Sequence, residues 1–204
     1  MPFVNIYFSL GSNLGNREAN ITEALRRMDE AFGCHYSALS RLIETKPMGF
    51  SGGKFLNAAV LYRVYTASSE TNPVILSEAK DLAAKDLQIL RSQRDLRMTD
   101  MSQRDLRMTN LEPLEVLRRI KSIEREMGRT DPPEYDGEGN RVYHSRIIDI
   151  DILFYGAERI DLPELTIPHK GIADRPFVMI PLMEIAKPSL KSAFPEFFDA
   201  SPAD

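Results

Sequence analysis

Two aspartates, Asp149 and Asp151, interrupt an otherwise apolar run at residues 146–155. The run is rich in β-branched side chains and ends at Gly156, which is typical of a strand in the middle of a sheet. Because strand side chains alternate between faces, both carboxylates should point the same way, a few ångströms apart. Paired carboxylate oxygens suit Mg²⁺, which takes one or two carboxylates and completes its coordination with water and substrate phosphates.

Cationic groups surround this acidic pair in the sequence. Arg146 precedes Asp149 by three residues, where its guanidinium could meet a phosphate oxygen. Paired aspartates among several cations predict a Mg²⁺-nucleotide site, in which catalysis is mainly positioning and neutralisation of phosphate charge. The alternative is an edge strand with two solvated aspartates, and the apolar neighbours count against a fully wet face. The other candidate cations are Arg129, His169 and Arg175.

A polar residue, Asn57, lies inside a mostly apolar stretch, residues 55–65, that predicts another strand. Its amide either makes local hydrogen bonds or presents a donor–acceptor pair to a flat, amide-like ligand. Glycine-rich loops at 47–53 and 131–140 could close over a substrate. The turn at 11–16 lacks the lysine and spacing of a P-loop, so a structural turn is favoured over a phosphate cradle.

Hydrophobic periodicity predicts the elements that position these residues. Helical spacing predicts amphipathic helices at 17–32 and 112–127. The predicted strands are 3–10, 35–45, 55–65 and 146–155. The resulting order, β-α-β-β-α-β, is that of the α+β, ferredoxin-like arrangement, an antiparallel sheet with both helices on one face. The other face is left for loops and a ligand.

A C-terminal helical extension is expected at 174–186. Asp174 is a candidate cap, and Pro181 can kink or split the helix. The tail from Ser189 onward is expected to be loosely held. The apolar residues expected to pack inward are Phe177, Ile180, Leu182, Met183 and Ile185.

Residues 68–109 differ in character from the rest of the chain. The run SQRDLRMT at 92–99 recurs letter for letter at 102–109. A perfect short repeat in an irregular chain favours an insertion over a packed element. Because it is polar and has little to bury, we interpret it as a solvated insertion, partly helical or disordered, that interrupts a single domain spanning 1–204.

Composition narrows the classes of protein. With 204 residues and 43% hydrophobic content, the chain can bury one good core. A net charge of −4 gives no general reason to expect nucleic acid or an anionic membrane as partner. A single cysteine, Cys34, excludes an internal disulfide and fits a reducing compartment. No apolar run approaches the roughly 20 residues that span a bilayer, and no export signal is apparent, so we expect a cytoplasmic protein.

These motifs together resemble the 6-hydroxymethyl-7,8-dihydropterin pyrophosphokinase family of folate biosynthesis. The strongest part is the R-x-x-D-x-D segment that begins at Arg146, with a Pro-His pair at 168–169. The resemblance covers nearly the whole chain apart from the insertion and the extreme tail. The other matching segments are 9–15 (SLGSNLG), 55–60 (FLNAAV), 124–129, 175–177, 181–182 and 184–186.

The resemblance implies transfer of diphosphate from ATP to the pterin hydroxymethyl oxygen, with release of AMP. It implies two Mg²⁺ ions on Asp149 and Asp151 and small-molecule substrates. Separately, we expect a monomer. The catalytic positions it implies are Arg129, Arg146, Asp149 and Asp151. The ATP-binding positions it implies are Glu124, Arg129, Ile152, Thr166, His169 and Arg175. The pterin-binding positions it implies are Thr45, Pro47, Met48, Phe55, Asn57 and Phe177, with Phe55 and Phe177 stacking on the bicycle.

The chain departs from the family pattern before the aspartate strand. The family usually has a basic residue where this chain has Val142 and a small residue where it has His144, and Arg141 is placed to replace the lost charge. Two rival hypotheses remain open. One is a Mg²⁺-dependent phosphodiesterase or nuclease, which requires a further acidic ligand and a basic track. The other is a ligand-sensing or RNA-binding module, which would present aromatic residues where this strand presents aspartates.

Overall fold

The computed structural model describes residues 3–47, 52–65, 111–129, 134–135, 141–142 and 144–199. The predicted insertion at 68–109 and the candidate residue Met48 lie outside these ranges. In the part of the chain that the model describes, no helix is long and apolar enough to cross a membrane.

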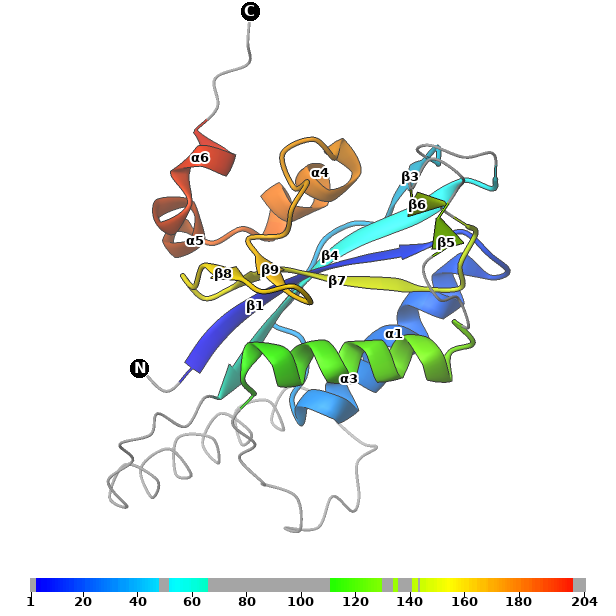
Figure 1. Cartoon of the computed structure of the whole chain (residues 1–204), viewed down its shortest axis with the longest axis horizontal. Helices are drawn as coiled ribbons and strands as arrows, with labels where there is room; N and C mark the ends of the chain where they lie inside the picture. Colours follow the sequence, from blue (N-terminus) through cyan, green and yellow to red (C-terminus); the bar gives the residue numbers. More distant parts are fainter. Residues whose placement is uncertain are drawn as a thin grey trace, which may run out of the picture.

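Three long strands form the centre of the molecule (Figure 1). They are β1 (Phe3–Ser12), β4 (Phe55–Tyr65) and β7 (Asp149–Tyr155). β1 lies between the other two and pairs antiparallel with both. The sheet order is β2-β4-β1-β7, and all of its pairs are antiparallel. The predicted class, a mixed fold with an antiparallel sheet and helices, is confirmed.

The predicted strand at 35–45 is two short strands, β2 (Ala38–Leu39) and β3 (Ile43–Thr45), which both pair with β4. Ser40 lies between them. Its hydroxyl oxygen accepts a hydrogen bond from the backbone N–H of Ala59 at 2.9 Å. A side chain therefore replaces a backbone partner here, and the regular strand stops.

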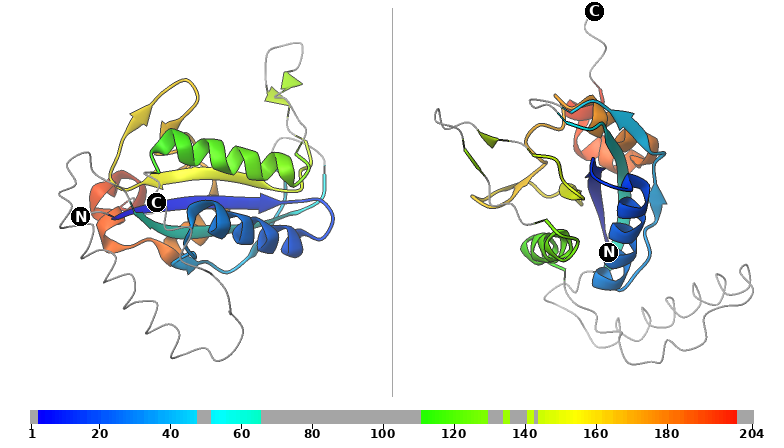
Figure 2. Two further views of the ribbon diagram at one scale, coloured as in Figure 1. Left: turned by 90° about the horizontal axis from the view of Figure 1, so that it is seen from below. Right: turned by 90° about the vertical axis from the view of Figure 1, so that its right-hand side faces the viewer.

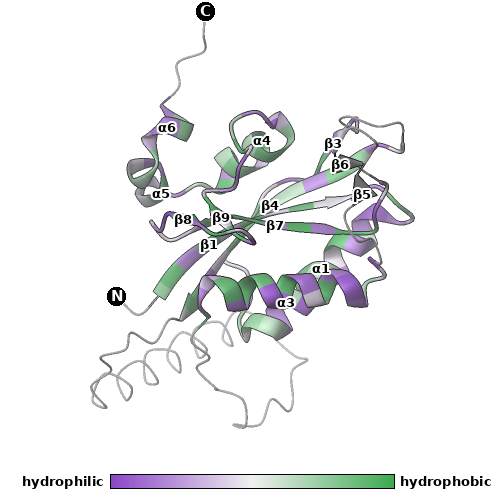
Figure 3. Cartoon of the chain, in the orientation of Figure 1, coloured by the Kyte–Doolittle hydropathy of each residue, from purple (hydrophilic) through white to green (hydrophobic). Residues whose placement is uncertain are grey.

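Two helices cover one face of the sheet, α1 (Arg17–Phe32) and α3 (Pro113–Glu126) (Figure 2). The Asn16 side chain caps α1 by accepting from the Ala19 N–H at 3.1 Å, and α1 ends at Gly33 with a left-handed φ of 68°. Hydrophilic and hydrophobic residues alternate around both helices, and the apolar side packs on the strands (Figure 3). The two predicted long helices are confirmed.

Three C-terminal helices pack on the opposite face, α4 (Pro176–Ile185), α5 (Pro188–Ala193) and α6 (Pro195–Phe198). The expectation of a loosely held tail after Ser189 is wrong, because Leu190 and Phe194 are buried against Phe154 and its neighbours. We call the face of the sheet opposite α1 and α3 the outer face. The C-terminal helices cover one end of it, so only the other end is left to loops and a ligand, as expected for the whole face.

The details of α4 also differ from the prediction. Its cap position is Arg175, which makes no side-chain capping bond, so Asp174 is not the cap. Ile180 and Met183, which were expected to pack inward, are 47% and 44% exposed. The helix is apolar on nearly every side, so periodicity could not identify its buried face. The residues that it buries are Val178, Pro181 and Leu182.

Two small strand pairs complete the described structure. β5 (Glu134–Tyr135) pairs with β6 (Arg141–Val142) inside and beside the predicted loop at 131–140. β8 (Ile160–Asp161) pairs with β9 (Thr166–Ile167), and a cis peptide bond joins Ile167 to Pro168.

Candidate active site

The two aspartates of β7 share the outer face, as their spacing predicts. Ile150 and Ile152 alternate with them and are buried in the helix-side core. Asp149 and Asp151 are half-buried and point away from α1 and α3. The register between β1 and β7 shifts between Tyr7 and Phe8, which pair with Phe154 and Ile152. This irregularity lies beyond Asp151, so it does not disturb the acidic pair.

Cross-strand register places Asn57 and Asp149 in one row. Gly11 of β1 pairs with Asn57 on one side and with Asp149 on the other. Because Gly11 has no side chain, the floor between the amide and the carboxylate is open. A Cβ atom at Gly11 would lie 3.1 Å from Asn57 Oδ1 and 3.6 Å from the Phe55 ring. Small residues are therefore required where the two candidate substrate sites meet.

The next row places Ser9 between Ala59 and Asp151. Ala59 is 1% exposed and Ser9 is 9% exposed. One row further, Tyr7 faces the apolar cluster of the C-terminal helices. The outer face thus changes from apolar to polar along a few residues of β1.

Two arginines hold Asp149. Arg129 Nη1 donates to Asp149 Oδ1 at 2.6 Å, and Arg146 Nη1 lies 2.9 Å from Asp149 Oδ2. Burial alone would raise the pKa of the Asp149 carboxyl, but Arg146 and then Arg129 outweigh it, and the pKa is lowered. Asp149 is therefore a carboxylate at neutral pH.

The buried Glu124 positions Arg129. Glu124 is 1% exposed, and its Oε1 accepts from Arg129 Nη1 at 2.6 Å and from the Ile150 N–H at 2.7 Å. Its other oxygen lies 2.8 Å from Lys121 Nζ. Burial raises the pKa of Glu124, the Lys121 charge opposes the shift, and Asp149 adds to it. Sequence reasoning proposed Glu124 for ATP, and in this geometry it ties α3 to β7 behind Arg129.

Asp151 has a different environment from Asp149. It makes no ion pair with any residue that the structure describes. Burial raises the pKa of its carboxyl, and the charge of Asp149 adds to the shift. Charges at His169, Lys121 and Arg175 oppose the shift. Among the described residues, Asp151 therefore lacks the paired counter-charge that Asp149 has, and a bound cation would supply it.

Asn13 is a site residue that sequence reasoning missed. Its Oδ1 accepts from the Arg146 N–H at 2.7 Å, and its Nδ2 donates to Ser145 Oγ at 3.0 Å and to the Gly53 carbonyl at 3.3 Å. It therefore ties the backbone of Arg146 to the end of β1. A single asparagine in a glycine-rich turn gives no sign of a partner some 130 residues away, so only the turn itself was predictable.

The chain matches the family model of 7,8-dihydro-6-hydroxymethylpterin-pyrophosphokinase (HPPK) over residues 7–101 and 103–187. A 2-amino-4-hydroxy-6-hydroxymethyldihydropteridine pyrophosphokinase from Porphyromonas gingivalis is 33% identical over 89% of this chain and 90% of its own length. An enzyme of the same name from Bacillus subtilis is 27% identical over 92% of this chain and 81% of its own length. A folate synthesis bifunctional protein from Arabidopsis thaliana is 32% identical over 90% of this chain, which spans 27% of that protein.

The chain belongs to the HPPK family. It is therefore an enzyme, a pyrophosphokinase of folate biosynthesis that uses ATP as co-substrate. This membership decides against both rival hypotheses, the nuclease and the RNA-binding module.

Of the residues expected to bind pterin, Thr45, Phe55 and Asn57 lie at the same end of the outer face as Asp149. Asn57 is 3% exposed, and its Nδ2 donates to Thr45 Oγ1 at 2.8 Å. The local hydrogen-bond interpretation thus accounts for the amide nitrogen. Phe55 lies two residues before Asn57 on β4, so both side chains are on the same face of the strand. The half-buried Phe177 of α4 packs against the apolar cluster of the C-terminal helices. Pro47 follows β3 and is half-buried.

The residues expected to bind ATP come from several separate segments of the chain. The backbone N–H of His169 donates to the Leu153 carbonyl at 3.1 Å, which places the Pro-His segment beside β7. Thr166 lies in β9 and pairs with Asp161 of β8. Ile152 is 3% exposed in the helix-side core, so only its backbone can reach a nucleotide on the outer face.

The glycine-rich turn after β1 is held by a side chain from the first turn of α1. Asn20 Nδ2 donates to the Leu14 carbonyl at 2.8 Å and to Ser12 Oγ at 3.1 Å, and Gly15 has a φ of 58°. This agrees with the structural interpretation of the turn.

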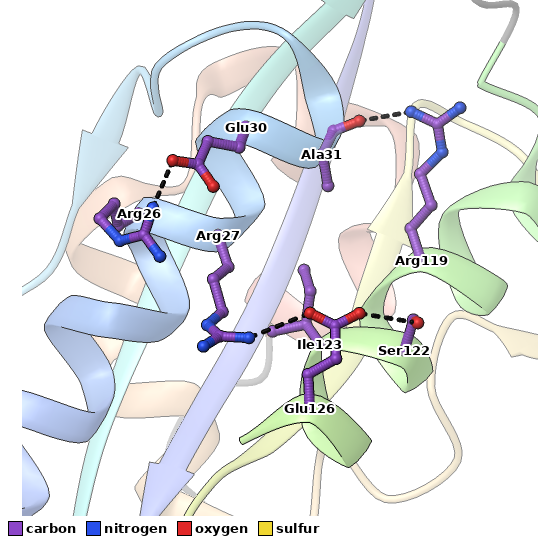
Figure 4. A pocket seen from close by; sticks show the side chains of 8 residues that line it. All are labelled: Arg26, Arg27, Glu30, Ala31, Arg119, Ser122, Ile123 and Glu126. Atoms are coloured by element: carbon purple, nitrogen blue, oxygen red, sulfur yellow. Dashed lines mark hydrogen bonds and ion pairs between the residues drawn. The ribbon is translucent and has the colours of Figure 1, made fainter.

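A groove of about 450 Å³ lies elsewhere, between α1 and α3 (Figure 4). Its arginines are paired with carboxylates or carbonyls. Arg27 binds Glu126 at 3.0 Å, and Arg119 donates to the carbonyl of Ala31. Because this groove is on the helix side of the sheet, the aspartates of β7 do not face it.

The donor set at Asp149 and Asp151 fits a hard divalent cation. Both supply carboxylate oxygens from one face of one strand. The pKa of Asp151 is raised by burial first and by the charge of Asp149 second. Among the described residues, no group of three or more histidines, cysteines and acids could hold a metal. A Mg²⁺ ion here would therefore take its remaining ligands from water and substrate phosphates.

Proposed function

We propose that the polar end of the outer face, from Asn57 across Gly11 to Asp149 and Asp151, is the site at which this enzyme transfers diphosphate from ATP to 6-hydroxymethyl-7,8-dihydropterin. The observation that carries the proposal is the shared row of Asn57, Gly11 and Asp149. This row places the Asn57 amide, which suits a flat heterocycle, and the Asp149 carboxylate, which suits a metal-bound phosphate, on the same face of the sheet. Gly11 lies between them.

The transfer is a substitution at phosphorus. The hydroxymethyl oxygen of the pterin forms a bond to the β-phosphorus of ATP, and the bond from that phosphorus to the oxygen shared with the α-phosphate breaks. AMP leaves with that oxygen, and the β- and γ-phosphates stay on the pterin. The hydroxyl proton passes to solvent, since we assign no side chain as general base. Mg²⁺, of which we propose two ions held by Asp149 and Asp151, supplies charge neutralisation to the triphosphate.

The cations around the acids bind the phosphates. We assign Arg129 and Arg146 to the transferred part of the triphosphate, because both reach Asp149. We assign His169 and Arg175 to the rest of the nucleotide, because the Pro-His segment lies beside β7 and the charges of both residues act on Asp151. Glu124 contributes by holding Arg129, and Thr166 and the backbone of Ile152 border the nucleotide. Catalysis then consists of positioning and of charge placed in advance.

The pterin site is built from β3, β4 and α4. We propose that Asn57 reads the amide-like edge of the bicycle with its Oδ1 and that Phe55 and Phe177 stack on its faces. Thr45 fixes the amide of Asn57 through the hydrogen bond at 2.8 Å. Pro47 and Met48 belong to the loop that borders this site in the proposal.

We further propose that the fold is the ferredoxin-like one with a C-terminal helical extension, since the strand order and the two helices on one face are those of that arrangement. Residues 68–109 are then an insertion into a single domain. We propose a monomer in the cytoplasm. A site supplied by one chain and a lone cysteine support this.

Incubation with ATP, Mg²⁺ and the pterin alcohol tests the site assignment. The wild type should form AMP and pterin diphosphate in equal amounts. Asp149→Asn should abolish both products, and Asp199→Asn, which changes an exposed aspartate after α6, should leave them unchanged. Equal turnover in the two variants would refute the assignment.

A further inference from the structure

Both oxygens of the Asp149 carboxylate are occupied by guanidinium groups. Arg129 Nη1 donates to Oδ1 at 2.6 Å, and Arg146 Nη1 lies 2.9 Å from Oδ2. The two arginine side chains are only 14% and 11% exposed, and that of Asp149 is 26% exposed. Partly desolvated, charge-assisted contacts of this length are strong ones. Asp151, two residues on, makes no ion pair within the described part of the chain.

The fold aims both arginines at Asp149. Arg129 Nη1 also donates to Glu124, which is itself fixed by Lys121 and by the N–H of Ile150. Arg146 is fixed through its backbone, because Asn13 exchanges two hydrogen bonds with it, from the Arg146 N–H at 2.7 Å and to the Arg146 carbonyl at 3.1 Å. Neither guanidinium reaches Asp149 from a freely moving segment.

We propose that Arg129 and Arg146 form a clasp that keeps divalent metal off Asp149 until a triphosphate binds. This rests on the proposed function of the site. In the nucleotide-free enzyme the clasp occupies the oxygens that a metal would need and supplies the positive charge that the acid requires. A triphosphate offers the guanidinium groups more negative charge and bidentate oxygen pairs, so they turn to the phosphates and free Asp149.

The clasp makes metal and nucleotide binding interdependent. The triphosphate raises the affinity of Asp149 and Asp151 for metal, and by linkage the metal raises the affinity for the triphosphate by the same factor. Couplings between sites are commonly about 5- to 150-fold. The enzyme would thereby take up metal and nucleotide together and avoid holding metal alone at its acids.

Binding of Mn²⁺ without nucleotide, measured by the loss of the free-ion electron paramagnetic resonance signal, tests the clasp. Arg146→Met removes one guanidinium from Asp149 and leaves the buried Glu124–Arg129 pair in place. This variant should bind Mn²⁺ alone at least about fivefold more tightly than wild type. Arg118→Met is the matched control, because Arg118 is exposed and pairs only with Glu115 of its own helix among the described residues. It should bind as wild type does.

A second variant and a second condition separate the possible failures. Arg129→Met should also tighten binding of Mn²⁺ alone. Its fold is checked by thermal unfolding, because among the described residues Glu124 then keeps only Lys121 as counter-charge. Because a non-hydrolysable ATP analogue itself binds Mn²⁺, the Mn²⁺ that co-elutes with the protein on a desalting column is measured when the analogue is present. Wild type should retain Mn²⁺ and Asp149→Asn should not. Retention of Mn²⁺ by wild type, with neither arginine variant binding Mn²⁺ alone more tightly, would overturn the clasp. Loss of retention in wild type would overturn the proposed metal site itself.

Discussion

The two faces of the central sheet are built from the same strands and do different work. On β1, Ile6, Phe8 and Leu10 face α1 and α3 and are fully buried. Their neighbours on the other face change from an apolar Tyr7 to a bare Gly11. Because adjacent residues point in opposite directions, a strand can give one face entirely to stability and divide the other between stability and chemistry.

The outer face shows the division within itself. Near the N-terminal end of β1 it is covered by α4, α5 and α6, whose Leu182, Leu190 and Phe194 complete a second core. Near the C-terminal end of β1 it carries Asn57, Asp149 and Asp151 and small residues between them. The helices therefore cover the end that has apolar side chains and leave the half-buried acids to the proposed site.

The largest expected effect on turnover is at Asp151, on the outer side of β7. It is compared with a substitution on the helix side of the same strand. Asp151→Asn should lower turnover by at least about 1,000-fold, since several kcal/mol of charge stabilisation of the triphosphate is lost. It should change the free energy of unfolding by less than about 1 kcal/mol, because Asp151 has no ion pair within the described structure. Steady-state kinetics and urea unfolding check both values.

The matched variant is Ile150→Ala, one residue away on the helix side. It should cost about 2–5 kcal/mol of unfolding free energy and leave the turnover of the folded enzyme within a few-fold of wild type. If both variants lost stability alike, or both lost only activity, the separation between the two faces would be refuted.

Phe194→Ala tests the covered end of the outer face. Phe194 is fully buried, and its ring centroid lies 4.8 Å from that of Phe154. Its truncation should cost about 3–5 kcal/mol of unfolding free energy. Ile180→Ala, on the exposed side of α4, should change it by less than about 0.5 kcal/mol and serves as the control. Equal urea midpoints for the two variants would restore the interpretation of a loosely held tail.

Asn57→Ala tests the open end. Removing an amide that meets the pterin edge should raise the KM for pterin by about 5- to 150-fold, the equivalent of about 1–3 kcal/mol for a lost buried partner. The KM for ATP should stay within about twofold. Both constants are measured by varying one substrate while the other is saturating. Similar rises in the two constants would show that Asn57 supports the whole floor and does not read the pterin.

The placement of the acidic pair was predictable from the sequence because it depends only on the two-residue period of one strand. The helices at 17–32 and 113–126 were predictable for the corresponding reason, a clear apolar stripe. The pairing of Arg129 and Arg146 with Asp149 was not, since contacts between separate elements depend on register and side-chain direction. Asn13 and the division of the predicted strand at Ser40 were missed for the same reason.

The C-terminal region shows a second limit of sequence reasoning. The tail after Ser189 carries three phenylalanines, but it is short and has no regular apolar periodicity, so by itself it gives little reason to fold. Its Phe194 is buried because β1, β4 and β7 present an apolar end of matching size on the outer face. That complementarity exists only between segments far apart in the chain, so no local pattern in the tail could predict it.

The smallest expected effect is at Cys34, which packs on the helix side of the sheet. Burial, and to a lesser extent the charge of Asp29, raises the pKa of this thiol from 9.0 to about 11. The raised pKa means less thiolate at any given pH, about 100-fold less than for a thiol at the unshifted value. Iodoacetamide should therefore modify Cys34 slowly at pH 7.5, with a rate that rises about tenfold per pH unit up to pH 10.

Cys34→Ser should leave turnover within about twofold of wild type, because the thiol lies on the face opposite the proposed site. Mass spectrometry of the alkylated protein measures the modification rate, and urea-unfolded enzyme provides the unshifted reference. Fast alkylation of the folded protein at pH 7.5, or loss of turnover on modification, would mean that the helix side is open to solvent or coupled to the site. Slow alkylation with full activity would agree with a closed helix side that takes no part in turnover.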